Sequence, residues 1–177
     1  MRIISGVHKG RRITAPKSLP IRPTTDFAKE ALFNILNNRF QFKDLIVVDL
    51  FSGSGNIAYE FGSRGAGTVT AVDENMEGVK FINKIAGELD LNITAVKSDV
   101  FKYLEKAPIK ADIIFADPPY DFDVDSLSKL VFLTFDKELL KEEGELIIEH
   151  SKRIDLSHLE HFYEIRKYGN SVFSFFT

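Results

Sequence analysis

The stretch LIVVDLFSGSG, residues 45–55, decides how this chain folds. Its opening run of short, mostly β-branched apolar residues, 45–48, predicts a buried strand. Asp49 follows, then a loop with two glycines, and the pattern of residues 56–61 indicates the start of a helix. A strand that leads through a glycine loop into a helix N-terminus suits a nucleotide-like ligand, because glycine lets backbone approach the ligand and the helix offers free N–H groups.

The glycine loop alone does not establish a ligand. Its glycines fit G-x-G-x-x-A through Ala58, which is close to the dinucleotide-binding pattern. An isolated match of this kind fits an ordinary strand-to-helix turn equally well. The residues that follow the loop therefore have to decide between the two interpretations.

Composition predicts one soluble domain. The chain has 177 residues, of which 44% are hydrophobic, and it has no cysteine. A chain of this size fits a single domain with a sizeable core. No apolar run reaches the roughly 18 residues of a membrane span, and the first residues lack the apolar region of a signal peptide. We therefore expect a cytoplasmic protein with no membrane partner.

Charge is distributed unevenly along the chain. The net charge is −3, yet residues 1–22 contain six basic residues and no acid. A basic arm on an acidic body favours a polyanion that binds through the arm. A solvated basic hairpin without a partner is the alternative. The basic residues of the arm are Arg2, Lys9, Arg11, Arg12, Lys17 and Arg22.

The same segment has the pattern of a small β-hairpin. Residues 2–5 and 12–15 alternate, and they flank a turn at 8–11. Three prolines between residues 16 and 23 then indicate a connecting loop. We expect a basic N-terminal hairpin over 1–22 and the main domain over 23–177. Thr24 or Thr25 is a candidate N-cap for a helix that begins near Asp26 and runs to about residue 38.

From residue 45 onward, strand and helix patterns alternate. Short connections between them imply a parallel sheet with helices on both faces. The tail adds two strands around a turn at 169–170, which gives an antiparallel edge. The sequence therefore predicts an α/β, Rossmann-like fold with a mostly parallel seven-stranded sheet. Its expected strands are 45–48, 68–72, 93–96, 111–116, 145–149, 162–166 and 171–176.

Four of the predicted strands end in an acid: Asp49, Asp73, Asp99 and Asp117. The carboxyl ends of parallel strands meet at one edge of the sheet, where ligands of such folds bind. A helix cap or a turn explains any one of these acids, but the four together favour a ligand site. Asp73 stands near the spacing at which an acid meets ribose hydroxyls, and Asp99 can accept from a purine amine.

The sequence Asp117-Pro118-Pro119-Tyr120 is the most specific signal in the chain. Two prolines fix the backbone and remove two N–H donors, so that the carboxylate and the carbonyls present only acceptors. A planar –NH₂ group fits such acceptors, and Tyr120 can stack on the ring that bears it. The alternative is a rigid turn with a buried tyrosine.

These motifs resemble a known family. The glycine loop resembles the first cofactor motif of class I S-adenosylmethionine-dependent methyltransferases, and the Asp-Pro-Pro-Tyr motif resembles that of enzymes that methylate exocyclic amines. RIISG (2–6), KGRR (9–12), RPTTD (22–26) and EALFN (30–34) resemble the RsmD family of bacterial 16S rRNA guanine-N2 methyltransferases. The common pattern has Ala at Ser52 and often Glu at Asp73, and both changes are mild.

The resemblance implies an enzyme that uses S-adenosylmethionine and acts on 16S rRNA or on the assembling small ribosomal subunit. Asp117, Pro118, Pro119 and Tyr120 would hold the target guanine. RNA phosphates would meet Arg2, Lys9, Arg11, Arg12 and Arg22. The cofactor would contact Thr24, Thr25, Asp49, Phe51, Gly53, Ser54, Gly55, Asp73, Asp99 and Val100.

Other functions remain open at this stage. A DNA adenine-N6 or a protein-glutamine methyltransferase would share the chemistry, whereas a dinucleotide oxidoreductase explains only the glycine loop. A non-enzymatic alternative is an RNA-binding module with a relic cofactor pocket. No metal is expected, because His158 and His161 have ligand-like spacing but no third ligand joins them.

Overall fold

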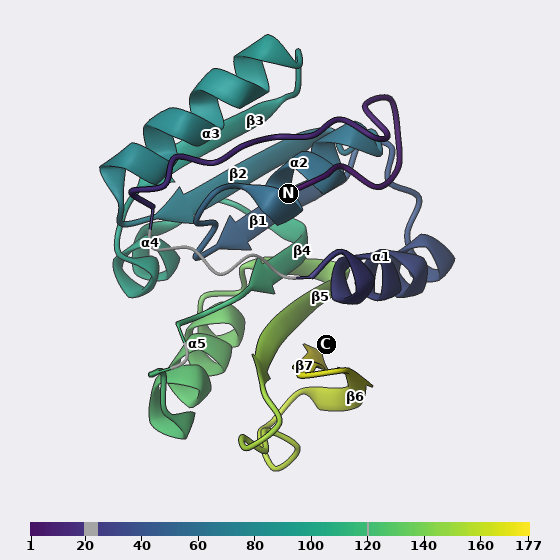
Figure 1. Ribbon diagram of the computed structural model, residues 1–177. Coiled ribbons are helices and arrows are strands. Elements are labelled where there is room, and N and C mark those ends of the chain that lie inside the picture. The colour runs from purple at the N-terminus through teal and green to yellow at the C-terminus, as the bar shows by residue number, and fades with distance from the viewer. Residues whose placement is uncertain (20–24, 120) are drawn as a thin grey trace.

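The computed structural model describes residues 1–19, 25–119 and 121–177 (Figure 1). Within this part of the chain the strands form one seven-stranded sheet in the order β3-β2-β1-β4-β5-β7-β6. Strands β1 to β5 are parallel, and β7 and β6 pair antiparallel beside β5. The predicted mostly parallel sheet is confirmed. The strands are β1 (Ile46–Leu50), β2 (Thr68–Asp73), β3 (Ile93–Lys97), β4 (Ala111–Ala116), β5 (Leu140–Ser151), β6 (Phe162–Tyr168) and β7 (Ser171–Phe176).

Helices cover both faces of the sheet because successive strand residues point to opposite sides. Val47 and Phe115 belong to one core cluster, together with residues of α1, α2 and α3. Val48 and Ile114 belong to the other cluster, with α4 and α5. The helices are α1 (Asp26–Arg39), α2 (Asn56–Ser63), α3 (Met76–Glu88), α4 (Val100–Lys106) and α5 (Val124–Asp136).

Helix α1 begins where the sequence predicts. The Thr25 hydroxyl accepts a hydrogen bond from Ala28 N at 3.1 Å, so Thr25 is the N-cap, and Asp26 lies in the first turn. Leu32 and Leu36 of its apolar stripe are fully buried. Helical spacing in the sequence also predicts Phe27 on this apolar face, but its side chain is 66% exposed. Thr24, the other candidate cap, lies outside the described residues.

The N-terminal segment forms less regular pairing than the predicted hairpin. Arg2 and Arg12 make a single antiparallel bridge, and Ile3 N donates to Arg11 O at 3.0 Å. The next two backbone N–H groups donate to the Glu60 carboxylate of α2 instead, at 2.8 and 2.9 Å. Because α2 takes these donors, the segment runs over α2 as Figure 1 shows. Ile13 also joins the main core.

One glycine fixes this docking. Gly6 has a φ of 82°, and a Cβ there would lie 1.8 Å from the Ser63 carbonyl oxygen. The following residues bind the same end of α2: Val7 N donates to Ser63 O at 2.8 Å and His8 N to the Ser63 hydroxyl at 3.0 Å. Within the described residues, no helix has the length and apolar character needed to cross a membrane.

Candidate functional site

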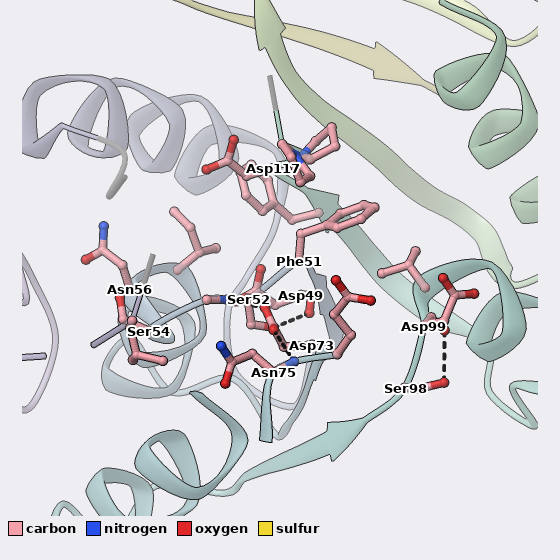
Figure 2. A pocket seen from close by; sticks show the side chains of 18 of the residues that line it. Asp49, Phe51, Ser52, Ser54, Asn56, Asp73, Asn75, Ser98, Asp99 and Asp117 are labelled. Carbon is pink, nitrogen blue, oxygen red and sulfur yellow. Dashed lines mark hydrogen bonds between the residues drawn. The ribbon is translucent and has the colours of Figure 1, made fainter. Parts of the chain in front are cut away.

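A pocket of about 480 Å³ opens at the carboxyl ends of β1, β2 and β4 (Figure 2). This volume lies in the range of small-molecule sites. The pocket brings together residues that are far apart in the sequence, as expected for this edge of a parallel sheet. The predicted residues that line it are Asp49, Phe51, Gly53, Ser54, Asp73, Asp99, Val100, Asp117, Pro118 and Pro119.

The glycine loop has a backbone that most residues avoid. Phe51, Gly53 and Gly55 all have positive φ, at 58°, 53° and 82°. Gly55 is the N-cap of α2 and does not line the pocket; a Cβ there would lie 2.8 Å from the Tyr59 ring. Thr25 likewise caps α1 and is not among the lining residues. Both residues therefore shape elements beside the pocket.

Asp49 is a buried carboxylate in the wall of the pocket. It is 2% exposed, and one of its oxygens accepts a hydrogen bond from Ala58 N of α2 at 3.1 Å. Burial, together with the neighbouring Asp73 carboxylate, raises the pKa of Asp49 to about 8, although the hydrogen bond from Ala58 N acts in the opposite direction. A cationic ligand group would favour the ionised form. This position therefore suits a ligand that carries an amine.

Asp73 fixes the glycine loop. Its carboxylate accepts from Gly53 N at 2.7 Å. It also accepts from Asn75 N at 2.8 Å (Figure 2). Each carboxylate oxygen has two lone pairs, so both oxygens keep acceptor capacity toward the pocket. The geometry thus allows Asp73 to bind a diol while it holds the loop.

Asp99 lies on the opposite side of the pocket from Asn56 (Figure 2). Its carboxylate caps α4 by accepting from Lys102 N at 2.9 Å. Asp99 therefore does act as a helix N-cap, which is the alternative role considered for each strand-end acid. Ser98 and Val100 line the pocket beside it, so the same turn presents an acceptor and an apolar surface to a ligand.

The Asp117-Pro118-Pro119 turn closes a further side of the pocket. Asp117 N donates to Leu50 O at 3.4 Å, and Phe122 N donates to Pro119 O at 3.0 Å. The Phe122 ring meets Phe51 edge to face, with the ring centroids 5.1 Å apart. These rings give the pocket an apolar wall next to its acceptors. Tyr120 lies outside the described residues.

Several lining residues were not predicted from the sequence. Leu19 and Phe122 come from loops, and Phe115 comes from a strand that is otherwise plain core. Of these residues, Asn56 could most easily have been predicted to line the pocket, because it is the first residue of α2 and directly follows the glycine loop. The remaining lining residues outside the prediction are Ser52, Ile57, Glu74, Asn75 and Ser98.

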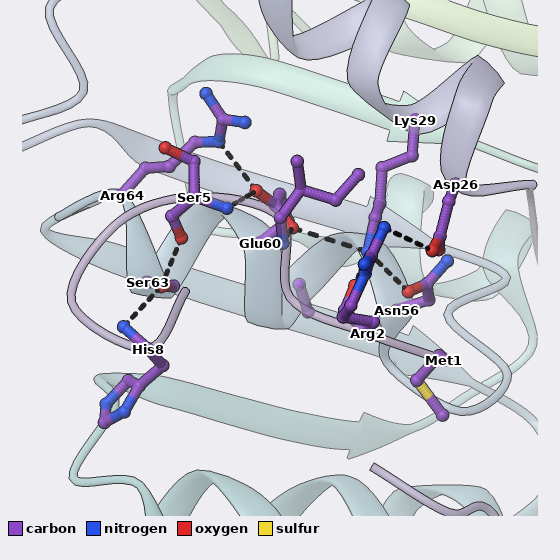
Figure 3. A network of polar contacts seen from close by, with 12 residues as sticks. Met1, Arg2, Ser5, His8, Asp26, Lys29, Asn56, Glu60, Ser63 and Arg64 are labelled. Carbon is purple, nitrogen blue, oxygen red and sulfur yellow. Dashed lines mark hydrogen bonds and ion pairs between the residues drawn. The ribbon is translucent and has the colours of Figure 1, made fainter. Parts of the chain in front are cut away.

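Asn56 connects the pocket to a buried charge network (Figure 3). Lys29 of α1 donates to the Asn56 side-chain oxygen at 2.8 Å and to Arg2 O at 2.7 Å. Its ammonium lies 3.4 Å from Glu60, and both side chains are almost fully buried. Burial lowers the pKa of Lys29, and Glu60 acts in the opposite direction. The network joins α1, α2 and the N-terminal segment next to the pocket.

The predicted phosphate-binding residues gather on the N-terminal segment. Lys9, Arg11 and Arg12 are exposed at or beside its turn. Arg2 is also exposed and lies 3.3 Å from Asp26 of α1. Arg22 lies outside the described residues. Across residues 1–19, 25–119 and 121–177, no group of three or more His, Cys, Asp or Glu side chains is arranged to hold a metal ion.

The chemistry of these residues fits S-adenosylmethionine. The buried Asp49 suits an ammonium group, and Asp73 suits a ribose diol. Asp99 with Val100 suits a purine, because an acceptor lies beside an apolar side chain. The positive-φ glycine loop lets backbone approach a ligand closely.

The fold and this pocket define a Rossmann-like class I methyltransferase. A solved structure described as the putative methyltransferase yhhF from Escherichia coli has the same fold, with a TM-score of 0.86 over 99% of this chain and 96% of that chain, at 25% identity. The family described as conserved hypothetical protein 95 matches residues 1–177. The chain belongs to this family, which is the RsmD family of S-adenosylmethionine-dependent methyltransferases.

Two curated relatives cover most of the chain. The ribosomal RNA small subunit methyltransferase D of Buchnera aphidicola subsp. Baizongia pistaciae is 31% identical over 156 residues, which is 88% of this chain and 78% of the relative. The putative rRNA methyltransferase YlbH of Bacillus subtilis is 32% identical over 161 residues, 88% of this chain and 85% of the relative.

Proposed function

We propose that this protein transfers a methyl group from S-adenosylmethionine to the exocyclic N2 amine of a guanine in 16S rRNA. The observation that carries the proposal is that Asp117, Pro118 and Pro119 line the same pocket as Asp49 and Asp73. A site for an amine and a site for the cofactor thus share one cavity. The relatives are named ribosomal RNA small subunit methyltransferase D and putative rRNA methyltransferase, and both names support the RNA substrate.

S-adenosylmethionine, when bound, supplies a methyl group that its sulfonium has already activated. The protein therefore needs to hold and orient both partners. Asp49 would hold the amino group of the cofactor, Asp73 the ribose, and Asp99 with Val100 the adenine. Asp49 lines the pocket but is almost fully buried. Its negative charge is therefore stabilised mainly when the amine of the cofactor is bound.

The target amine is a poor nucleophile because its lone pair is delocalised into the guanine ring. The Asp117 carboxylate and the Pro118 carbonyl would accept its two N–H bonds and direct the lone pair toward the methyl group. Orientation of this kind can lower a barrier by roughly 7–11 kcal/mol. The nitrogen gains a bond to carbon, the carbon–sulfur bond breaks with its electrons going to sulfur, and a proton leaves the amine to water.

The base has to leave any duplex before it can enter such a pocket. The basic N-terminal segment would bind phosphates around the base. Its exposed residues for this role are Arg2, Lys9, Arg11 and Arg12, and Arg22, which lies outside the described residues, would add to them. Phosphate contacts fix position without reading sequence. In this proposal the segment therefore adds affinity for the phosphate backbone, and the pocket selects the base.

The test is transfer of a labelled methyl group from S-adenosylmethionine. The acceptors are unmethylated small subunits, naked 16S rRNA, adenine-rich duplex DNA and a glutamine-bearing protein. Label on N2 of an rRNA guanine is the expected result, and the two rRNA acceptors show whether assembly matters. Label only on DNA or protein would overturn the substrate, and cofactor binding with no label on any acceptor would favour an RNA-binding module.

Asp117→Ala tests the chemistry directly. We expect turnover to fall by about 100-fold or more, because the amine loses an orienting acceptor, while cofactor affinity stays near normal. Asp121→Ala is the matched control, since Asp121 is an exposed acid four residues along that does not line the pocket. Near-normal turnover of Asp117→Ala would show that the amine site has been assigned wrongly.

A further inference from the structure

Phe27 is an aromatic side chain left largely in solvent. It occupies the first turn of α1 and is 66% exposed, although Ala28, Leu32 and Leu36 of the same helix are fully buried. Its ring meets the partly buried Tyr168 ring of β6 edge to face, with the centroids 6.2 Å apart and the planes at 75°. Phe27 and Tyr168 together form what we call the aromatic pair.

The aromatic pair lies at the same edge of the sheet as the pocket. Ser151 at the end of β5 pairs with Ser171, and Ser171 pairs with Tyr168, so Tyr168 is at the carboxyl edge. Asp117 follows β4 at this edge, three strands away in the order β4-β5-β7-β6. With 4.7–4.9 Å between neighbouring strands, the separation along the edge is about 14 Å. RNA whose target base enters the pocket can therefore reach the pair with a nucleotide a few positions along the strand.

The charge along this edge is suited to a polyanion. Lys152 and Arg153 directly follow β5 and are exposed. Lys167 is also exposed, but it precedes Tyr168 on β6, so its side chain points to the opposite face of the sheet. None of them has an ion-pair partner among residues 1–19, 25–119 and 121–177. Lys152 and Arg153 therefore extend the basic surface beyond the N-terminal segment.

Acidic groups near the pair are mostly neutralised by cations. Asp26 lies 3.3 Å from Arg2, and Glu164 of β6 makes ion pairs with Arg39 and Arg166. Glu30 is exposed on α1, about 4.5 Å further along the helix axis than Phe27. The surface around the aromatic rings is therefore compatible with a nearby phosphate backbone.

We propose that the aromatic pair is a stacking site for a base of the rRNA substrate a few nucleotides from the methylated guanine, with phosphates bound by Lys152 and Arg153. Exposed aromatic rings beside cations bind single-stranded RNA in this way, because every base has a π-face. The inference rests on the proposed function, since RNA must be the substrate. It adds a binding subsite outside the cofactor pocket and the N-terminal segment.

The absence of tryptophan from the sequence provides a direct test. In Phe27→Trp the only tryptophan reports on stacking, and its fluorescence should be quenched when a 16S rRNA fragment containing the target is added. Phe132→Trp is the matched control, because Phe132 is 61% exposed but lies on α5, against the other face of the sheet. No quenching at residue 27, or equal quenching at residue 132, would overturn the inference.

Kinetics give a second test. Phe27→Ala should raise the KM for RNA by about 5- to 150-fold, the range for loss of one stacked base, with kcat and S-adenosylmethionine affinity within about 2-fold of normal. Phe27→Tyr should restore the KM, and Phe132→Ala should leave it unchanged. An unchanged KM for Phe27→Ala would overturn the inference. A defect seen with assembled subunits but not with naked rRNA would also overturn it, in favour of a protein contact.

The two proposals fail in different ways. If the wild-type chain methylates rRNA while Phe27→Ala behaves normally, only the stacking site is wrong. If RNA quenches Phe27→Trp selectively but no RNA is methylated, the stacking site stands as an RNA contact and the methylation reaction is wrong. If RNA neither binds nor is methylated, both proposals are overturned.

Discussion

Individual carboxylates that line the pocket also form hydrogen bonds that hold the backbone of the fold, and these bonds affect how they can bind a ligand. Asp73 holds the glycine loop through two backbone N–H groups, and Asp99 caps α4. Asp49 differs because it is buried with a pKa raised to about 8, chiefly by desolvation. A ligand that brings a positive charge to Asp49 therefore changes both its ionisation and the stability of the protein.

The Asp49 pKa predicts how stability depends on pH. Between the ordinary value of 3.8 and about 8, the folded state holds a proton that the unfolded state has lost. The stability of the ligand-free protein should therefore fall as pH rises through this window, by up to about 1.4 kcal/mol per pH unit. Asp49→Asn should remove this slope. Urea unfolding of both proteins between about pH 5 and pH 8 measures it, and parallel curves would contradict the assignment.

At the scale of elements, the start of α3 presses on the glycine loop. Gly78 lies in the first turn of α3, and a Cβ there would meet the Gly53 carbonyl oxygen at 2.7 Å. Because the contacted atom belongs to the backbone of the glycine loop, a larger residue at position 78 would force that loop to move. The close approach of α3 thus sets the position of the loop that lines the pocket.

Gly78→Ala should therefore weaken S-adenosylmethionine binding by about 10- to 100-fold, because the loop is displaced. Gly87→Ala on the same helix is the control, since a Cβ there meets nothing within 4 Å. That variant should bind the cofactor normally and gain about 0.5–1 kcal/mol of stability. Calorimetric titration and thermal unfolding give the two values. Equal affinities for the two variants would rule out the contact as the constraint on the loop.

The buried Lys29–Glu60 pair joins α1 to α2 and to the N-terminal segment (Figure 3). Glu60 accepts from two backbone N–H groups of that segment, and Arg64 also contacts it at 2.9 Å. Lys29→Met leaves the Glu60 charge buried with fewer partners. Loss of one member of a buried pair typically costs about 3–5 kcal/mol, and we expect that range here.

Chemical unfolding measures this cost, and Lys84→Met is the matched control. Lys84 pairs with Glu88 on the exposed surface of α3, with 72% of its side chain in solvent. Exposed pairs of this kind contribute about 0.2–1 kcal/mol at most. A loss below about 1 kcal/mol for Lys29→Met would mean that the network does not hold the segment in place.

For the whole molecule, the basic N-terminal segment predicts salt-dependent RNA binding. If its five predicted phosphate-binding residues each contact a phosphate, the segment should contribute about −3.5 to −4.5 to the slope of the logarithm of affinity against the logarithm of salt concentration. Replacing Lys9, Arg11 and Arg12 with alanine should reduce the slope by about 2 to 3, since each contact contributes about 0.7 to 0.9. Filter binding across a salt series tests this, and an unchanged slope would remove the segment from the RNA interface.

Sequence alone determined the order of strands and helices, the residues at the strand ends and the lining of most of the pocket. These features follow from local patterns: β-branched runs, glycine turns and acids placed directly after strands. The carboxyl ends of parallel strands share one edge, so spacing along the chain already places Asp49, Asp73 and Asp117 near one another.

Only the tertiary structure decided which polar residues are buried and which apolar ones are exposed. Lys29 is a charged residue, yet the N-terminal segment and α2 enclose it. Phe27 belongs to the apolar stripe of the same helix, yet the sheet ends at Tyr168 and leaves its ring in solvent. Both outcomes depend on contacts between segments distant in sequence, which no local pattern records.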